Sequence, residues 1–386
     1  MKFPVYLDYN ATTPCDERVV EAMLPFFTKH FGNAASRSHP YGWEAEEAVE
    51  YAREQLAKLI GAEPKEIIFT SGATEADNLA LKGVFQMYPG KGNHIITVNT
   101  EHKAVLDTCR RLEAEGGEVT YLNVKPDGII DLEELEASIR PTTILIAVMY
   151  ANNETGTIQP VKEIGAIAKK RGVLFFTDST QAVGKIPVNV LEDEIDLMAF
   201  SAHKMYGPKG VGALYVRRKN PRVKITPQID GGGHEKGLRS GTMNVPAIVG
   251  FGKAAELALN EMKTESKRLS ALRDKFESEV LKLDGTAING STVKRLPHVS
   301  NISFGYVDGN ALMIGLNKNI AVSSGSACTS ASPEPSHVLK ALGLDDEPAH
   351  SSLRFSLGRN TTGEEIDYAI EQVSKTVKKL KETINI

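Results

Sequence analysis

Apolar segments typical of β-strands alternate with amphipathic segments typical of helices along most of this 386-residue chain. The segments EIIFTSG, HIITVN, EVTYLNV, TILIAVMY and VLFFTD are short and mostly apolar, and a stretch with helical periodicity separates each from the next. Strands of this kind form parallel sheets whose two faces are both covered by helices. The pattern therefore predicts an α/β fold, with a three-layer α/β/α large domain and a mostly parallel sheet over residues 15–255.

A second, smaller unit is predicted from the rest of the chain. The segment from Ala254 to Leu283 predicts one long charged helix that connects the two units. Beyond it, NISFGYV and LRFSLGR have the composition of strands and residues 364–384 that of a helix, an order typical of an α+β domain. We assign residues 1–14 and 256–386 to this small domain.

The loop SSGSACTSASPEP, residues 323–335, places Cys328 in a run of small and polar residues. Because the run has no large apolar anchor, we expect it to be exposed and flexible. The other two cysteines, Cys15 and Cys109, form no CxxC pair with it, which excludes a disulfide framework and a cysteine zinc site. Either Cys328 is incidental, or its sulfur has to move.

Charge and hydropathy limit the classes of partner. A net charge of −4 argues against a broad nucleic-acid-binding face and against an anchor on an acidic membrane. The N-terminal MKFPVYLDYN has no apolar signal-peptide core, and the longest apolar run, ILIAVMYA, is too short to span a bilayer. We expect a cytoplasmic protein whose partners are small molecules and proteins, with no nucleic acid and no membrane.

Polar residues follow the predicted strands at their carboxyl ends, where ligands bind in sheets of this type. Ala73 and Thr74 open a helix after EIIFT, and a helix N-terminus suits a phosphate, although Thr74 could also be a plain helix cap. Asp178 and Gln181 follow VLFFT. The carboxylate is either a turn residue or the partner of a protonated ring nitrogen.

Three more strand ends carry polar groups. Ser201, His203 and Lys204 follow MAF, His102 opens a helix after HIITVN, and Asn153 lies in the turn after TILIAVMY. Each alone has an ordinary interpretation as a surface or turn residue. Pyridoxal phosphate would use the whole set: a helix N-terminus for its phosphate, a lysine for its aldehyde, a carboxylate for its pyridinium and an imidazole to stack on its ring.

Two other ligand classes fit less well. The segment GPKGVG has the glycines of a dinucleotide fingerprint in the wrong order, and no G-x-x-x-x-G-K-[ST] is present. The nine histidines are scattered without HxxxH or HxxEH spacing, so the sequence predicts no resident metal.

Nine motifs resemble those of the NifS/IscS-type cysteine desulfurases, class V aminotransferase relatives with the type I fold of pyridoxal-phosphate enzymes. They are YLDYNATTP (6–14), FTSGATEADNLA (69–80), TEHKAVL (100–106), NNETG (152–156), DSTQAVGK (178–185), SAHKMYGPKGVGALYVRR (201–218), GGGHEKGLRSGT (231–242), SSGSACTSASPEPSHVL (323–339) and LRFSLGR (353–359). The resemblance runs in one register from about residue 5 to about residue 380.

The resemblance implies a role for each matching residue. The cofactor residues are the Schiff-base lysine Lys204, the pyridinium partner Asp178, the stacking and proton-handling His102, Gln181 and Asn153 near the ring hydroxyl and substrate, the phosphate contacts Ala73, Thr74, Ser201 and His203, and Thr242 from a second subunit. Arg354 is implied to hold the substrate carboxylate, and it lies on the opposite strand face from Leu353 and Phe355. Asn33 is implied to lie near the substrate.

The resemblance also implies the reaction and explains the loop. L-cysteine bound to pyridoxal 5′-phosphate gives up its sulfur to the Cys328 thiolate, which leaves a persulfide on the enzyme and releases L-alanine. A free thiol has a pKa of about 8.5, so it needs a proton acceptor or a cationic site. The family further implies a homodimer and a sulfur-acceptor protein such as an iron–sulfur scaffold. It also implies that the sulfur can be used to thiolate tRNA or cofactors and that Cys328 transiently contacts a nascent iron–sulfur cluster.

Some features depart from the family or leave alternatives open. Asn33-Ala34 stands where the family commonly has Asn-Pro, and MYANNETG is nearer the NifS branch while the cysteine loop is nearer the housekeeping IscS branch. The acceptor therefore stays open. The alternatives are a selenocysteine lyase, another enzyme on this fold such as an aminotransferase, and a non-catalytic docking scaffold. The cysteine loop disfavours the aminotransferase, and the intact set of site residues disfavours the scaffold.

Overall fold

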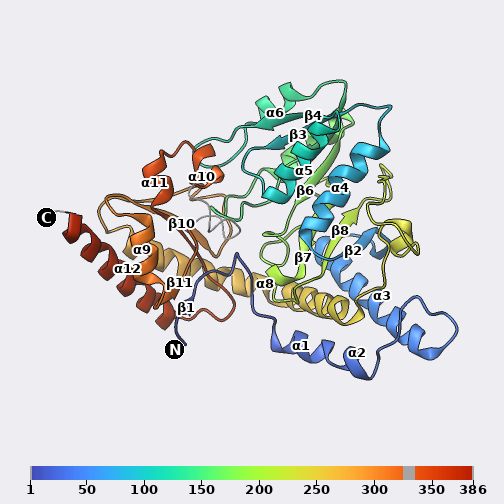
Figure 1. Cartoon of the computed structure of the whole chain (residues 1–386), viewed down its shortest axis with the longest axis horizontal. Coiled ribbons are helices and arrows are strands. Elements are labelled where there is room, and N and C mark those ends of the chain that lie inside the picture. The colour runs from blue at the N-terminus through green and yellow to red at the C-terminus, as the bar shows by residue number, and fades with distance from the viewer. Residues whose placement is uncertain (1, 325–334, 385–386) are drawn as a thin grey trace.

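The structure is a computed structural model that describes residues 2–324 and 335–384. Its largest element is a seven-stranded sheet (Figure 1). The strands are β2 (Ile67–Thr70), β3 (His94–Val98), β4 (Glu118–Leu122), β5 (Thr143–Ala147), β6 (Leu174–Asp178), β7 (Leu197–Ser201) and β8 (Gly212–Val216). Their order is β2-β8-β7-β6-β5-β3-β4, and β8 runs antiparallel to both of its neighbours while the other pairs are parallel. The predicted mostly parallel sheet is confirmed.

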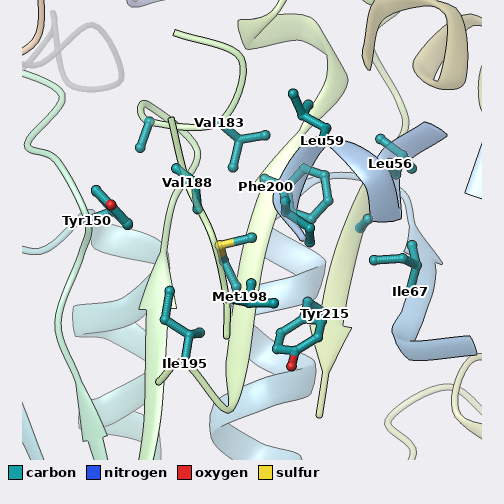
Figure 2. Close-up of a cluster of buried hydrophobic side chains, with 14 of the residues drawn as sticks. Leu56, Leu59, Ile67, Tyr150, Val183, Val188, Ile195, Met198, Phe200 and Tyr215 are labelled. Atoms are coloured by element: carbon teal, nitrogen blue, oxygen red, sulfur yellow. The ribbon is translucent and has the colours of Figure 1, made fainter. Parts of the chain in front are cut away.

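Helices cover both faces of this sheet. The helices of this part of the chain are α1 (Glu17–Met23), α2 (Pro25–Thr28), α3 (Pro40–Ile60), α4 (Ala73–Met87), α5 (Lys103–Ala114), α6 (Leu132–Ser138), α7 (Val161–Arg171) and α8 (Val245–Val280). Because neighbouring strand residues point to opposite faces, Phe175 packs with α3, α6, α7 and α8 while Phe176 packs with α4 and α5. Figure 2 shows the first of these cores, where Leu56 of α3 lies near Phe200 of β7. The three-layer fold is confirmed.

Helix α8 differs from its prediction at the N-terminal end. It begins at Val245 rather than at Ala254, and the Asn244 side chain caps it by accepting from the backbone N–H of Ala247. Its first turns are apolar and pack against α3, so the charge pattern that marked the helix starts only further along the chain. No helix in the described part of the chain combines the length and apolarity needed to cross a membrane.

The rest of the chain forms a smaller unit with a core of its own. Strands β9 (Thr286–Ile288), β10 (Val299–Phe304) and β12 (Ser352–Ser356) form an antiparallel sheet, and β1 (Val5–Tyr6) pairs in parallel with β11 (Ile320–Ala321). The helices are α9 (Gly309–Leu316), α10 (His337–Ala341), α11 (Asp346–His350) and α12 (Gly363–Ile384). The far end of α8 packs into this core (Figure 1). The domain limits at residues 14/15 and 255/256 stay a prediction.

Candidate active site

A cavity of about 460 Å³ lies at the carboxyl ends of the central strands of the large sheet. Its wall contains ten of the residues that the sequence had singled out: Ala73, Thr74, His102, Asn153, Asp178, Gln181, Ser201, His203, Lys204 and Arg354. Nine come from the large sheet and its connections, and Arg354 comes from β12 of the smaller unit. The fold thus brings side chains from distant parts of the sequence to one place.

Two residues of the predicted site lie elsewhere, and a third is not among the described residues. Asn33, between α2 and α3, and Thr242, just before α8, are both exposed and do not line the cavity. Cys328 lies outside the described residues, as does most of the loop 323–335.

The N-terminus of α4 forms one end of the cavity. Gly72 is its N-cap and no side chain caps the helix there, so the first-turn N–H groups and the helix dipole favour an anion. A Cβ on Gly72 would meet no heavy atom within 4 Å, whereas a Cβ on Gly212 of β8 would come within 2.7 Å of the Gly72 backbone. A glycine in β8 therefore lets this turn sit tightly against the sheet while the space beside Gly72 stays open.

The Lys204 amine is positioned by the N-terminal segment of the chain. Lys204 ends the short 3-10 helix η2 (Ala202–Lys204), which follows β7 directly. Its Nζ donates to the backbone oxygens of Asn10, at 2.6 Å, and of Ala11, at 2.7 Å. These hydrogen bonds hold the amine at one place in the cavity wall rather than spread over many rotamers.

Asn10 links several parts of the site. Its side chain is only 1% exposed, donates from Nδ2 to the Asn153 carbonyl at 2.9 Å and accepts from Nε2 of His298 at 2.8 Å. Its backbone oxygen also accepts from Nε2 of Gln181 at 3.0 Å, and Oε1 of Gln181 accepts from Nζ of Lys185 at 2.7 Å. The residue therefore holds the N-terminal segment against both the large sheet and the smaller unit.

Asn10→Ala is expected to lower the free energy of unfolding by about 1–3 kcal/mol, because it leaves the buried His298 N–H without a partner and removes one of the two donors to the Asn153 carbonyl. Chemical denaturation measures the loss. The control is Asn260→Ala, since Asn260 is exposed on α8 and alanine is a better helix former there. Equal stability of Asn10→Ala and the parent protein would contradict the linking role of Asn10.

Asp178 supplies the carboxylate of the site. It is the last residue of β6 and is buried, and its Oδ1 accepts from the backbone N–H of Thr180 at 2.9 Å. This hydrogen bond is local and fixes the rotamer, since a carboxylate at a strand end commonly closes its own turn. The side chain remains in the cavity wall.

Two imidazoles in the cavity wall are held in defined states. His102 caps α5, and its Nδ1 accepts from the backbone N–H of Ala104 at 3.1 Å, so a neutral ring carries its proton on Nε2. Burial first, and then the nearby Lys204 charge, lower the pKa of His203 to about 4. His203 is therefore neutral at neutral pH, and its Nδ1 lies 3.1 Å from the Thr12 hydroxyl.

Arg354 crosses from the smaller unit into the cavity. Its strand neighbours Leu353 and Phe355 point into the core of that unit, as strand alternation predicts. The guanidinium donates from Nη2 to the Asp8 carboxylate at 2.7 Å and from Nη1 to the Asn153 carbonyl at 3.0 Å. These contacts fix a buried cation on the wall of the cavity.

Several residues of the site were not singled out from the sequence. They are Asp8, Asn10, Asp77, Glu101, Lys185 and His337. The motif YLDYNATTP contains Asp8 and Asn10, but a search of the strand ends cannot find them because they come before the first strand of the large sheet. His337 lines the cavity beyond the cysteine loop and donates from Nε2 to the Glu101 carbonyl at 3.0 Å.

Comparison with known proteins places this geometry in a family. The family model described as "Aminotransferase class-V" matches residues 5–369. A protein named cysteine desulfurase IscS from Histophilus somni (strain 129Pt) is 59% identical over 384 residues, covering 99% of this chain and 95% of that protein. A protein of the same name from Anaeromyxobacter sp. (strain Fw109-5) is 58% identical over 383 residues, covering 99% and 94%.

Solved structures agree with the sequence relatives. A NifS-like protein has a TM-score of 0.90 and 41% sequence identity, with 98% of this chain and 100% of that chain covered. A structure of SspA in complex with cysteine has a TM-score of 0.82 and 39% identity, with 92% and 98% covered. Both likenesses extend over the large sheet and the smaller unit together.

Proposed function

This chain belongs to the class-V aminotransferase family, and we propose that it is a pyridoxal-phosphate-dependent cysteine desulfurase that converts L-cysteine to L-alanine and transfers the sulfur to an acceptor. The relatives named cysteine desulfurase IscS cover 99% of the chain at 58–59% identity. One structural observation carries the proposal: an uncapped helix N-terminus, a buried carboxylate and an oriented lysine converge on a single cavity.

The donor set of that cavity fits pyridoxal phosphate. The start of α4, with Ala73 and Thr74, suits its phosphate, the Asp178 carboxylate suits its ring nitrogen, and the Lys204 amine suits its aldehyde. When bound, the cofactor supplies an electron sink for bonds at the substrate's α-carbon. The neutral state of His203 also fits, because a neutral imidazole can donate a hydrogen bond to phosphate while its other nitrogen faces the Thr12 hydroxyl.

We assign the remaining roles from the side-chain chemistry. Ser201 and His203 complete the phosphate contacts, and Gln181 and Asn153 hydrogen-bond to the ring oxygen and the substrate. His102 stacks on the ring and handles a proton, and Arg354 binds the substrate carboxylate. Asn33 is proposed to lie near the substrate because the family resemblance implies it. For the other residues the support is position in the cavity wall and a functional group able to make the contact.

Cys328 is proposed as the residue that takes the sulfur from L-cysteine. Its thiolate attacks the substrate sulfur, and the S–S bond of a persulfide forms on Cys328 as the Cβ–S bond of the substrate breaks. The electron pair of the broken bond stays on the carbon fragment, which takes up protons and leaves as L-alanine. His337 shows that the chain re-enters the cavity wall nine residues after Cys328, because its ring lines the cavity. Nine residues can extend over roughly 30 Å, so this anchor leaves the thiol within reach of the cavity.

A two-substrate assay tests the proposal. The purified chain, loaded with pyridoxal phosphate, is expected to release alanine and sulfide in equal amounts from L-cysteine in the presence of a thiol reductant. L-selenocysteine is assayed alongside, because a selenocysteine lyase would release selenide and alanine while leaving L-cysteine nearly untouched. Absence of both products from L-cysteine would reject the proposed function.

Arg354→Ala is expected to raise the KM for L-cysteine by about 10- to 100-fold, the effect of losing charge-assisted hydrogen bonds worth roughly 1.5–3 kcal/mol. Steady-state kinetics measure it, and the cofactor absorbance shows whether the site stays intact. Because Arg354 also pairs with Asp8, Asp8→Asn is measured in parallel to separate loss of the ion pair from loss of the substrate contact. An unchanged KM in Arg354→Ala would make the arginine purely structural.

We also propose a homodimer, a protein acceptor and a cytoplasmic location. Thr242 lies on an exposed segment outside the cavity of its own chain, which suits a contact with the cavity of a second subunit. Sedimentation of the purified protein tests the dimer.

The proposed acceptor is an iron–sulfur scaffold or a thiolation protein, and transfer of labelled sulfur from the persulfide to each candidate distinguishes them. Cys15 and Cys109 are free thiols, as in a reducing compartment.

A further inference from the structure

Asp77 is a buried carboxyl group that the roles above leave unused. It lies on α4, four residues after Ala73, and its side chain lines the cavity. The residue is 1% exposed, and neither carboxyl oxygen has a hydrogen-bond partner among the described residues. A buried polar group that points into a cavity without a partner is available to whatever occupies that cavity.

The charged groups that shift the pKa of Asp77 have the same sign as its own. Burial first, and then the Asp178 and Glu101 carboxyls, raise the pKa of Asp77 well above its ordinary value. No lysine or arginine in the described part of the chain forms an ion pair with it. Lys204 and His102 line the same cavity as Asp77. The Asp77 oxygens nevertheless have no hydrogen-bond partner among the described residues.

Glu101 forms the other side of this acidic cluster. Its Oε1 accepts from the Met149 N–H at 2.5 Å, while Oε2 is buried without a partner among the described residues. Burial and the Asp178 carboxyl raise the pKa of Glu101 as well. Within residues 2–324 and 335–384, no group of three or more His, Cys, Asp or Glu is arranged to hold a metal ion. Protons, rather than a cation, are the natural means of neutralising these carboxyls.

We propose that Asp77 is a protonated, neutral carboxylic acid in the resting site and that its O–H donates a hydrogen bond to the ligand of the cavity. The ligand part of this inference rests on the proposed function, because the group that Asp77 would meet is the bound pyridoxal phosphate. Asp77 is a positioning residue: it supplies a donor beside Asp178 without adding a second negative charge.

The protonation state is tested on the full chain without added cofactor. If folded Asp77 keeps a proton that the unfolded chain releases above about pH 4, stability conferred by this site falls as the pH rises. Asp77→Asn keeps the shape and a donor but cannot ionise, so it removes that loss. The measured quantity is the melting temperature of Asp77→Asn minus that of the parent protein. We expect this difference to be at least about 2 °C larger at pH 8 than at pH 5.

The control for this measurement is Asp284→Asn, whose parent side chain is 90% exposed. Its melting temperature relative to the parent protein is expected to show no such rise with pH. A constant or falling difference for Asp77→Asn would mean that Asp77 is ionised in the folded protein, and the proposal would be overturned whether or not the chain is a desulfurase.

The donor role is tested by cofactor binding. Asp77→Leu removes the donor at similar volume, and we expect its dissociation constant for pyridoxal phosphate to exceed that of Asp77→Asn by roughly 5-fold, the worth of one hydrogen bond. Equal dissociation constants for the two variants would overturn the donor role. If the parent chain itself binds no pyridoxal phosphate, the proposed function fails, while the pH-dependent stability still decides the protonation state.

Discussion

Lys204→Ala is expected to bind pyridoxal phosphate without a covalent link and to form neither alanine nor sulfide from L-cysteine. The Lys204 amine is held in the cavity wall by the backbone oxygens of Asn10 and Ala11, and alanine offers no nitrogen at that point. Activity should fall by at least roughly 10³-fold. The measurements are the visible absorbance of the loaded protein and the mass of its peptides after borohydride reduction. The peptide with residue 204 should carry the cofactor in the parent protein and not in Lys204→Ala.

Two neighbouring lysines make this a sharp comparison. Lys103 and Lys209 also line the cavity but are exposed. Lys103→Ala and Lys209→Ala are each expected to keep the reduced adduct on residue 204 and the parent absorbance. Lys204→Arg keeps the positive charge and should still lose the link. An adduct on either neighbouring lysine in the parent protein would move the cofactor attachment away from Lys204.

The fold was largely predictable because its main signal is local. The strands β2, β3, β4 and β5 are short and are each followed by a helix, so much of the order of elements and the parallel sheet follow from periodicity. The start of α8 was not predictable in the same way. Its first turns are apolar and pack in the same core as α3 and the sheet. A prediction based on charged amphipathic residues therefore places the start of the helix too far along the chain. The length of a buried helix depends on what covers it.

The candidate site was predictable where it follows the strand ends. Asp178, His102 and Lys204 each follow a strand of one sheet, and the carboxyl ends of parallel strands share an edge. Asn10 is different, since its carbonyl meets the Lys204 amine across 194 residues of sequence. No local pattern reports such a contact, and the motif resemblance covered the segment without giving Asn10 a role.

Asp77 shows a second limit of sequence reasoning. On the sequence it is one acidic residue in a helix with an ordinary apolar face, and an acid in that place is usually solvated. Only the packing of α4 against the sheet puts Asp77 in the cavity wall, where the Asp178 and Glu101 carboxyls act on it. Burial and like charge are properties of the assembled structure, and they decide whether the group is an anion or a hydrogen-bond donor.

The two described cysteines, Cys15 and Cys109, are poor nucleophiles. Cys109 is fully buried, and burial raises the pKa of its thiol to about 12. Burial and the nearby Asp16 carboxylate raise the pKa of Cys15 as well. Since the thiolate is the reactive form, neither residue suits attack on a substrate sulfur at neutral pH. Cys328, which lies outside the described residues, is the proposed nucleophile.

Cys328→Ala is therefore expected to keep the cofactor absorbance and its change on adding L-cysteine while sulfide release falls by at least roughly 10²-fold. The proposed cofactor and substrate contacts come from described residues of the cavity wall, and the substitution leaves all of these in place. Binding and sulfur transfer are therefore expected to separate. Cys15→Ala is the matched control and should release sulfide at the parent rate. Mass spectrometry after a short incubation with L-cysteine should find one added sulfur on the Cys328 peptide of the parent protein. Undiminished sulfide release by Cys328→Ala, or an added sulfur on Cys15 or Cys109, would assign the acceptor thiol elsewhere.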